Sequence, residues 1–136
     1  RLLINHILIH LLGIFSKGTY PLDESLAEAR RTVALFIEDL NNTYHHPWTL
    51  DGMARYCHLG KTRFSTWFKE LTNLSPIDYL NRLRITKSME MIKNNHASIT
   101  EIAWSSGFSS VQYFSNVFRK INGFSPRSYQ QQTEQA

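Results

Sequence analysis

The sequence predicts an all-α protein in which two helix-turn-helix units are joined by a long helix. The main observation is an internal repeat: FSTWFKELTNLSPIDY at residues 64–79 returns as FSNVFRKINGFSPRSY at residues 114–129. Seven positions carry the same or a similar residue at a constant offset, which indicates a duplicated structural unit. In each copy a short segment with one apolar face and a turn precede the repeat, as in a helix-turn-helix. Two copies are too few for a solenoid, which needs about three or more.

The chain begins with an almost wholly apolar run, LLINHILIHLLGIF, at residues 2–15. The run is shorter than the ~20 residues of a membrane span and polar residues interrupt it, so we expect no transmembrane segment. It also lacks the basic start and cleavage site of a secretory signal. We expect residues 1–22 to be a helix and linker left from an upstream domain, with residues 1–15 packed in cis or forming a homodimer contact. His6 and His10 share a helical face, but polar positions of an interface are favoured over metal ligands.

A second helix is predicted from Glu24 to about Asn42, because apolar residues recur along it at helical spacing. Pro47 excludes a regular helix through the segment that follows. We expect this helix to open a folded domain of residues 23–130. Residues 131–136 are expected to be a flexible tail.

The two helix-turn-helix units are predicted at about residues 49–71 and 98–122. Thr49 and Ser98 are expected to cap the first helix of each unit. Ser98 together with Glu101 also fits the S-x-x-E capping box. The backbone N–H groups at these two helix starts are suited to phosphate groups.

A long helix is predicted between the units, at about residues 76–93. Ser75 is suited to the N-cap, Pro76 to the first helical position and Asp78 to the first turn. About 18 residues at about 1.5 Å rise give a rod of about 27 Å. The major groove of DNA returns to the same face about every 34 Å, so such a rod is suited to place two helices in successive grooves.

The second helix of each unit has one apolar and one polar face. In the first copy Phe64, Trp67, Phe68 and Leu71 form an apolar stripe at helical spacing. The opposite face carries short hydrogen-bonding side chains with a base near its end: Thr62, Ser65, Thr66 and Lys69, and in the second copy Gln112, Ser115, Asn116 and Arg119. Such side chains are suited to base edges and phosphates in a groove, although a merely solvated polar face remains the simpler interpretation of one copy alone.

Charge is distributed unevenly along the chain. The formal net charge is +4, and the repeated half from His58 to Arg127 holds ten Lys and Arg residues against four Asp and Glu residues. Residues 1–57 hold five against six. The basic excess therefore lies in the repeated half, which indicates a polyanionic partner there.

The pattern HxxxxxFSxxFKxxxxxSPxxYLNRLR, followed by ITEIAWSSGFSSVQYFSNVFRKINGFSPRSY, resembles the DNA-binding domain of AraC/XylS-type bacterial transcription regulators. The resemblance covers about residues 30–130. It implies about seven helices, sequence-specific binding to promoter DNA, a cytoplasmic location and an effector-sensing or dimerising domain before this one. RNA polymerase is a further expected partner. The sequence departs from the family pattern at His58 and Asn73, where the family often has Gly.

The resemblance also implies the residues that contact DNA. The expected base contacts are Thr62, Arg63, Ser65, Thr66, Val111, Gln112, Tyr113 and Asn116. The expected phosphate contacts are Lys61, Lys69, Thr49, Ser98, Ser115, Arg119 and Lys120. We expect no metal and no cofactor.

Two other classes of protein are alternatives to a DNA-binding regulator. A helical protein–protein adaptor would use the same basic faces on an acidic partner, and it remains the alternative. An enzyme is less favoured, because the sequence has no Gly-rich phosphate loop, no paired-carboxylate site and no metal-ligand spacing. Cys57, the only cysteine, is expected to be a small core residue.

Overall fold

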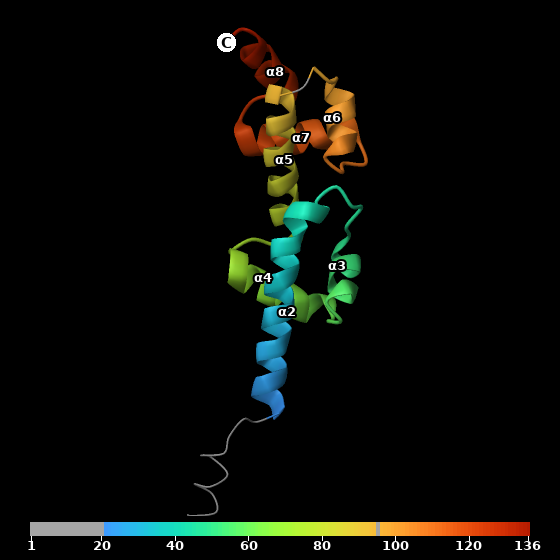
Figure 1. Cartoon of the computed structure of the whole chain (residues 1–136), viewed down its shortest axis with the longest axis vertical. Coiled ribbons are helices and arrows are strands. Elements are labelled where there is room, and N and C mark those ends of the chain that lie inside the picture. Colours follow the sequence, from blue (N-terminus) through green and yellow to red (C-terminus); the bar gives the residue numbers. More distant parts are fainter. Residues whose placement is uncertain (1–20, 95) are drawn as a thin grey trace, which may run out of the picture.

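The computed structural model describes residues 21–94 and 96–136, and every regular element in these ranges is a helix. The helices are α2 (Pro21–Thr43), α3 (Leu50–Tyr56), α4 (Lys61–Thr72), α5 (Pro76–Asn94), α6 (Ile99–Ser105), α7 (Val111–Asn122) and α8 (Pro126–Glu134). The molecule is elongated: α2, α3 and α4 form one end, α6, α7 and α8 form the other, and α5 runs between them (Figure 1). The predicted all-α architecture of two helix-turn-helix units and a linker helix is confirmed.

The predicted starts of α3, α5 and α6 are found at the predicted residues. Thr49 caps α3, and its side chain accepts a hydrogen bond from the Gly52 N–H at 3.0 Å. Ser98 caps α6 with both bonds of the capping box present. Ser75 accepts a bond from the Asp78 N–H at 3.3 Å at the start of α5.

The structure differs from the expected boundaries at both ends of the domain. Helix α2 begins at Pro21, inside the segment expected to be linker, because the fixed φ of proline suits the first helical turn. Helix α8 continues to Glu134, so most of the segment expected to be a flexible tail is helical. The Gln130 side chain, in the middle of α8, donates to the Ala97 carbonyl at 3.3 Å and connects α8 to the segment before α6. The expected helix at residues 2–15 lies outside the described residues.

Each unit has its own apolar core, and α5 contributes to both. The first core contains Val33, Phe36, Leu40, Met53, Ala54, Cys57, Phe64, Phe68 and Leu80. The second contains Ile85, Ile92, Ile102, Ala103, Phe108, Phe114, Phe118 and Tyr129. The linker helix is thus a structural part of both units rather than a free tether.

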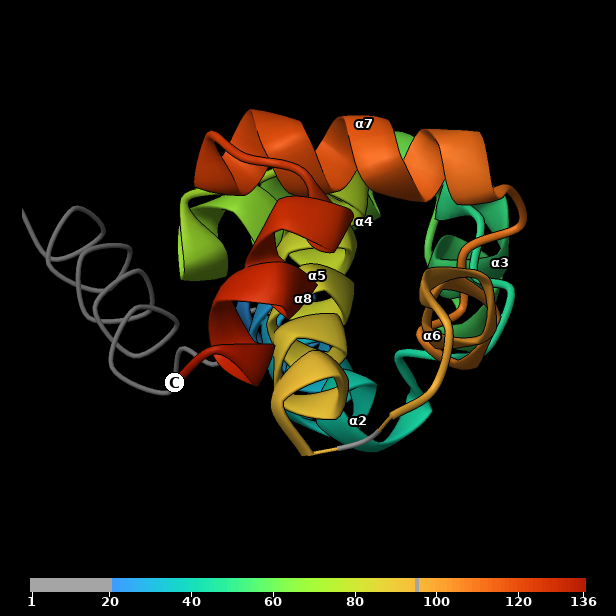
Figure 2. The ribbon, with the colours of Figure 1, turned by 90° about the horizontal axis from the view of Figure 1, so that it is seen from above.

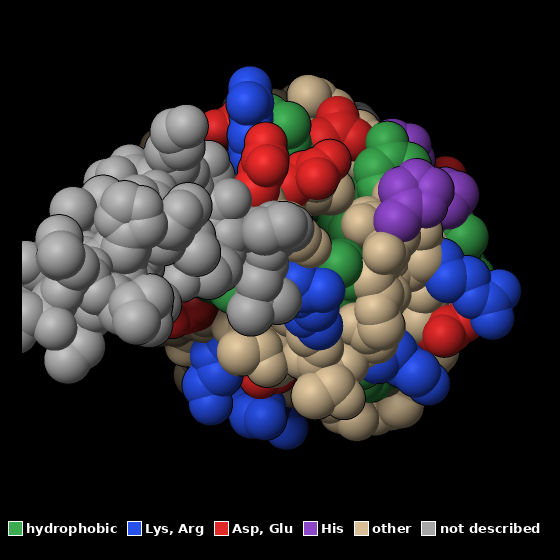
Figure 3. All heavy atoms as spheres, turned by 90° about the horizontal axis from the view of Figure 1, so that it is seen from below, with side chains coloured by type: hydrophobic (Ala, Val, Ile, Leu, Met, Phe, Trp, Pro, Cys, Tyr) green, Lys and Arg blue, Asp and Glu red, His purple; other side chains and the backbone are tan. Residues whose placement is uncertain are grey.

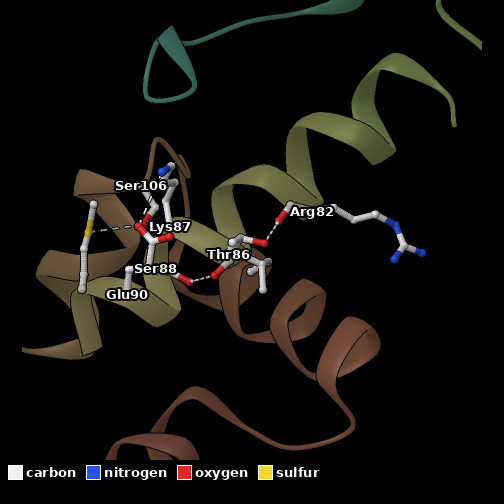
Figure 4. Close-up of polar contacts among 8 residues, drawn as sticks. Arg82, Thr86, Lys87, Ser88, Glu90 and Ser106 are labelled. Atoms are coloured by element: carbon white, nitrogen blue, oxygen red, sulfur yellow. Dashed lines mark hydrogen bonds and ion pairs between the residues drawn. The ribbon is translucent and has the colours of Figure 1, made fainter. Parts of the chain in front are cut away.

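Helix α5 also buries polar side chains, which the apolar pattern of the sequence did not indicate. Ser88 in α5 and Ser106, just after α6, are fully buried. The Ser88 hydroxyl donates to the Ile85 carbonyl at 2.7 Å, and the Ser106 hydroxyl contacts the Met91 sulfur at 3.8 Å (Figure 4). Each hydroxyl has a partner, so the junction of α5 with α6 stays close-packed despite its polarity.

The second unit repeats the first along the long axis of the molecule. Viewed down that axis, α7 lies in front of α4 and α6 lies in front of α3 (Figure 2). Helices α4 and α7, the second helix of each helix-turn-helix unit, therefore lie on the same side of the molecule.

Candidate nucleic-acid interface

The turn inside each helix-turn-helix has the same backbone conformation in both units. His58 in the first turn has φ of 55°, and Gly107 in the second has φ of 92°. The same holds after the second helices, where Asn73 has φ of 60° and Gly123 has φ of 82°. The two departures from the family pattern, His58 and Asn73, therefore keep the left-handed backbone that Gly adopts more readily.

Helices α4 and α7 bury and expose the same positions except the first, where Lys61 is exposed and Val111 is half-buried. Phe64 and Phe68 are fully buried in α4, as are Phe114 and Phe118 in α7. The exposed residues predicted as contacts are Lys61, Thr62, Arg63, Thr66 and Lys69 in α4, and Gln112, Tyr113, Asn116, Arg119 and Lys120 in α7. Ser65, Ser115 and Val111 are half-buried, and Val111 packs on the second core. Thr62, Ser65, Thr66 and Lys69 thus share one face of α4. Arg63 instead lines a hollow with residues of α2, among them Glu28.

Hydrogen bonds within these faces hold several side chains in place. The Thr66 hydroxyl donates to the Thr62 carbonyl at 2.9 Å. The Gln112 amide donates to the Asn116 side-chain oxygen at 3.2 Å. A neutral amide pair of this kind orients both side chains and leaves further donors and acceptors on each of them.

Tyr113 differs from the other predicted base contacts because it faces the linker helix. Its hydroxyl oxygen accepts a hydrogen bond from Asn81 of α5 at 2.9 Å, and its ring packs edge-on against Phe108 at 5.9 Å between centroids. The side chain is nonetheless 45% exposed. Tyr113 therefore connects α7 to α5 while its ring edge borders the outer face.

Three predicted phosphate contacts of the second unit meet at one hollow. Ser98, Ser115 and Arg119 line it, together with Arg127 in the first turn of α8. The sequence analysis did not include Arg127 among the expected phosphate contacts. Its position directly after the Ser-Pro cap, as a basic residue in the first turn of a helix, was a signal that could have identified it. The hollow joins side chains from α7 and α8 to the start of α6, so it combines two guanidinium groups with hydroxyls.

A carboxylate already occupies the start of α6. The Glu101 side chain accepts hydrogen bonds from the Ser98 backbone N–H at 2.8 Å and from the Ser98 hydroxyl at 3.0 Å. These bonds lower the pKa of the Glu101 carboxyl, the backbone bond more than the hydroxyl bond. Ser98 thus brings a negative neighbour to the hollow, whereas Arg119 and Arg127 bring positive charge.

Lys120 lies away from this hollow, in a groove between the two units. The groove is lined by the start of α5 and by α7, and it includes Arg82 and Lys120. The Arg82 side chain extends away from α5 (Figure 4). Seen from the far end of α2, Lys and Arg side chains are spread over the top, centre, right and lower edges of the described surface, whereas histidines gather beside hydrophobic side chains at the upper right (Figure 3).

In residues 21–94 and 96–136 there is no group of three or more His, Cys, Asp or Glu side chains placed to hold a metal ion. None of the described helices is long and apolar enough to cross a membrane. Burial raises the pKa of the Cys57 thiol to about 11, so it stays protonated at neutral pH.

Comparison with known proteins connects this geometry to a family. The model of a helix-turn-helix domain matches residues 53–132. The HTH-type transcriptional activator RhaS of Escherichia coli (strain K12 / DH10B) is 31% identical over 123 residues, which is 90% of this chain and 44% of RhaS. The chain therefore spans less than half the length of this relative.

Solved structures share the fold. A DNA-binding transcriptional dual regulator from Escherichia coli K-12 is 29% identical with a TM-score of 0.65, over 79% of this chain and 94% of that one. The DNA-binding domain of AdpA, solved in complex with a target DNA, has a TM-score of 0.73 at 21% identity, over 76% of this chain and 93% of that one. The adaptor alternative is not favoured by these relatives. The paired helix-turn-helix units, the matched family model and these relatives agree: the chain belongs to the AraC-type family of helix-turn-helix transcription regulators.

Proposed function

We propose that the chain is the DNA-binding part of a transcription regulator and that α4 and α7 enter two successive major-groove segments of one duplex. The observation that carries the proposal is the equal pattern of buried and exposed positions on two helices that lie on the same side of the molecule. The 19 residues of α5 span about 28 Å at about 1.5 Å rise per residue. This length is compatible with the repeat of the major groove, about 34 Å.

The proposed base contacts follow from the chemistry of the two outer faces. Gln112 and Asn116 can each donate to and accept from adenine, and their mutual hydrogen bond holds them in register. Thr62, Ser65 and Thr66 can bond to base edges or pack on thymine methyl groups, and Arg63 can bond to guanine. Val111 and Tyr113 can supply apolar contact, with Tyr113 held by Asn81 at the edge of the face.

The proposed phosphate contacts fall into two groups. In the second unit Ser98, Ser115 and Arg119 line one hollow with Arg127, which supports a phosphate contact there. Lys120 lies in the inter-unit groove with Arg82, and in the first unit Lys61, Lys69 and the capped start of α3 at Thr49 take the same role. Phosphate contacts of this kind position a protein on DNA without selecting sequence.

The test is a binding titration on duplexes selected from random DNA, with random DNA as competitor. We expect a sequence ratio above about a thousandfold and a strong salt dependence. The Arg119→Ala variant should weaken binding to all sequences alike and lower the salt slope by about one. Equal affinity for selected and random duplexes would instead favour the adaptor function.

The remaining parts of the proposal concern the whole protein. We propose a regulator without catalytic activity that acts in the cytoplasm and contacts RNA polymerase, because RhaS is named as a transcriptional activator. An effector would act through a further domain. The homodimer contact proposed for residues 1–15 lies outside the described residues.

A further inference from the structure

Arg84 of α5 joins the linker helix to a loop of the first unit. Its side chain is buried, with 7% exposed. The Nε donates to the Tyr44 carbonyl at 2.7 Å, and Nη2 donates to the His46 carbonyl at 2.7 Å. Both carbonyls belong to the loop between α2 and α3, so one guanidinium fork fixes this loop on α5.

The same guanidinium also contacts the turn of the second unit. Its central carbon lies 5.7 Å from the centre of the Phe108 ring, which is itself buried in the second core. A cation over an aromatic face at this distance is attracted to it, and more strongly where water is excluded. Arg84 is therefore in contact with the α2–α3 loop on one side and the α6–α7 turn on the other.

Gly107, next to Phe108, brings the backbones of the two units together. A Cβ atom added there would lie 2.8 Å from His45 Cα, 2.9 Å from the His45 carbonyl oxygen and 3.0 Å from Arg84 Nε. Contacts below 3.0 Å do not occur for real side chains, and His45 offers only backbone at this point. Glycine is thus required for the close approach as well as for the φ of 92°.

We propose that Arg84, supported by Gly107, is a positioning residue for DNA binding: it locks the α2–α3 loop to the α6–α7 turn and so keeps α4 and α7 at one fixed spacing. The proposal rests on the proposed function, because it concerns the joint use of both helices. It does not require Arg84 to touch DNA.

The physical reason is the gain from binding two segments as one rigid body. When two contact surfaces are held at the correct spacing, the second contact forms at a high effective concentration. A loose junction spreads the second helix over many positions and raises the entropy cost of the second contact. Arg84 also loses both carbonyl partners if the junction opens, and a buried cation without partners is unfavourable.

The first test compares wild type with Arg84→Met and Arg84→Lys on two kinds of duplex. The first kind is the intact duplex that this chain selects from random DNA. The second kind is the same duplex with the sequence of one half scrambled, made once for each half. For Arg84→Met we expect affinity for the intact duplex to fall by about tenfold or more, while affinity for the half-scrambled duplexes changes by less than about threefold. Arg84→Lys should give an intermediate loss, because an ammonium group cannot bond both carbonyls as a fork. Equal losses on both duplexes, or unchanged affinity for the intact duplex, would overturn the proposal.

Gly107→Ala and Gly123→Ala provide a matched pair that leaves Arg84 unchanged. Both glycines have a positive φ, but a Cβ at Gly123 meets nothing within 4 Å. Backbone strain is therefore common to both variants, and only Gly107→Ala pushes the units apart. We expect Gly107→Ala to lose affinity selectively for the intact duplex and Gly123→Ala to keep the wild-type ratio between the duplexes. The same ratio in both variants would contradict the proposed role of the junction.

A measurement without DNA separates this inference from the proposed function. Spin labels on Arg30→Cys in α2 and Gln131→Cys in α8 place one label on each unit, and both positions are exposed. We expect a single narrow distance distribution in the wild-type and Gly123→Ala backgrounds and a broader one with Arg84→Met or Gly107→Ala, at equal helix content by circular dichroism. An unchanged distance distribution in all four proteins would refute the locked junction even if DNA binding is confirmed.

If the wild type shows no sequence preference for DNA, the proposed function fails, and the label distances alone decide whether the locked junction exists. If Arg84→Met does not fold, Arg84→Lys and Gly107→Ala carry the comparison.

Discussion

The two helix-turn-helix units have the same buried side and different outer sides. At equal positions, Phe64 and Phe68 correspond to Phe114 and Phe118, and all four are fully buried. The left-handed residues and the exposed positions also correspond. The difference lies in where each second helix carries its charge.

Basic residues are distributed differently along the two second helices: α4 carries two at its start and one in its last turn, whereas α7 carries two in its last turn. Helix α4 begins with Lys61 and Arg63, whereas the equal positions of α7 are Val111 and Tyr113. In the last turn of each helix, α7 carries the larger positive charge. Lys69 and Glu70 nearly cancel in α4, whereas Arg119 and Lys120 add in α7, and Arg127 follows where the first unit has Ile77.

Under the proposed function, this difference predicts that the two units make unequal phosphate contacts. The charge of Lys61 is partly offset by Asp51, 4.0 Å away, whereas Arg119, Lys120 and Arg127 add their charges at the end of α7 and in α8. Unequal outer faces on equal scaffolds further imply an asymmetric DNA site. The predictions below test the equality of the scaffolds and the inequality of the faces.

The largest effect is expected in the two cores. Phe68→Ala and Phe118→Ala should each lower the free energy of unfolding by about 3–5 kcal/mol, because each removes a fully buried ring. Urea unfolding followed by circular dichroism measures both. A loss below about 1 kcal/mol in one unit alone would show that the two scaffolds are not equivalent.

The next effect concerns base recognition by the second unit. Gln112→Ala should reduce discrimination at one base pair by about 1–3 kcal/mol, because a side chain suited to adenine is lost. Thr62→Ala, at the equivalent position of α4, should reduce discrimination only at base pairs in the half of the DNA site that the first unit contacts. Competition binding on single-base variants of the selected duplex measures both, and an unaltered sequence preference in Gln112→Ala would remove this residue from the set of base contacts.

A smaller effect is expected at the caps of α3 and α6. Thr49→Ala and Ser98→Ala should each cost about 1 kcal/mol of stability, since each leaves a backbone N–H without its partner. Ser98→Ala should cost more, because it also removes the hydroxyl bond to Glu101. Thermal unfolding of the two variants compares the stability that each loses. A larger loss of stability for Thr49→Ala than for Ser98→Ala would contradict the stronger cap at α6.

The smallest effect is the pH dependence of the α6 cap. The folded-state pKa of Glu101 is lowered below its ordinary value of 4.5 by the bonds from Ser98, so the ionised form stabilises the folded state. This stabilisation is complete above pH 4.5 and is lost as the pH falls through the lowered pKa. Glu101→Gln should therefore be less stable than wild type near pH 7, and the difference should shrink in acid. Unfolding at a series of pH values tests this, and a difference that grows in acid would contradict it.

The sequence predicted the repeated parts of the molecule well and the junction between them poorly. Periodicity identified the buried Phe residues, and cap motifs located the starts at Thr49 and Ser98, because these features depend on residues close in sequence. The inward orientation of Asn81 and Arg84 was missed, because polar residues on a helix normally face water and their partners lie more than 30 residues away along the chain. The helical structure of residues 131–134, expected to be part of a flexible tail, was missed because the polar sequence PRSYQQQTE has few apolar positions to mark a helical face.

The central claim is that both second helices bind one duplex jointly at a fixed spacing. The most direct measurement is the affinity of the chain for its selected duplex before and after insertion of about five base pairs, half a helical turn, between the two halves. The structure predicts that the insertion lowers the affinity to that of a duplex with one half scrambled, because the second segment moves to the opposite face of the DNA. Unchanged affinity after the insertion would contradict the claim.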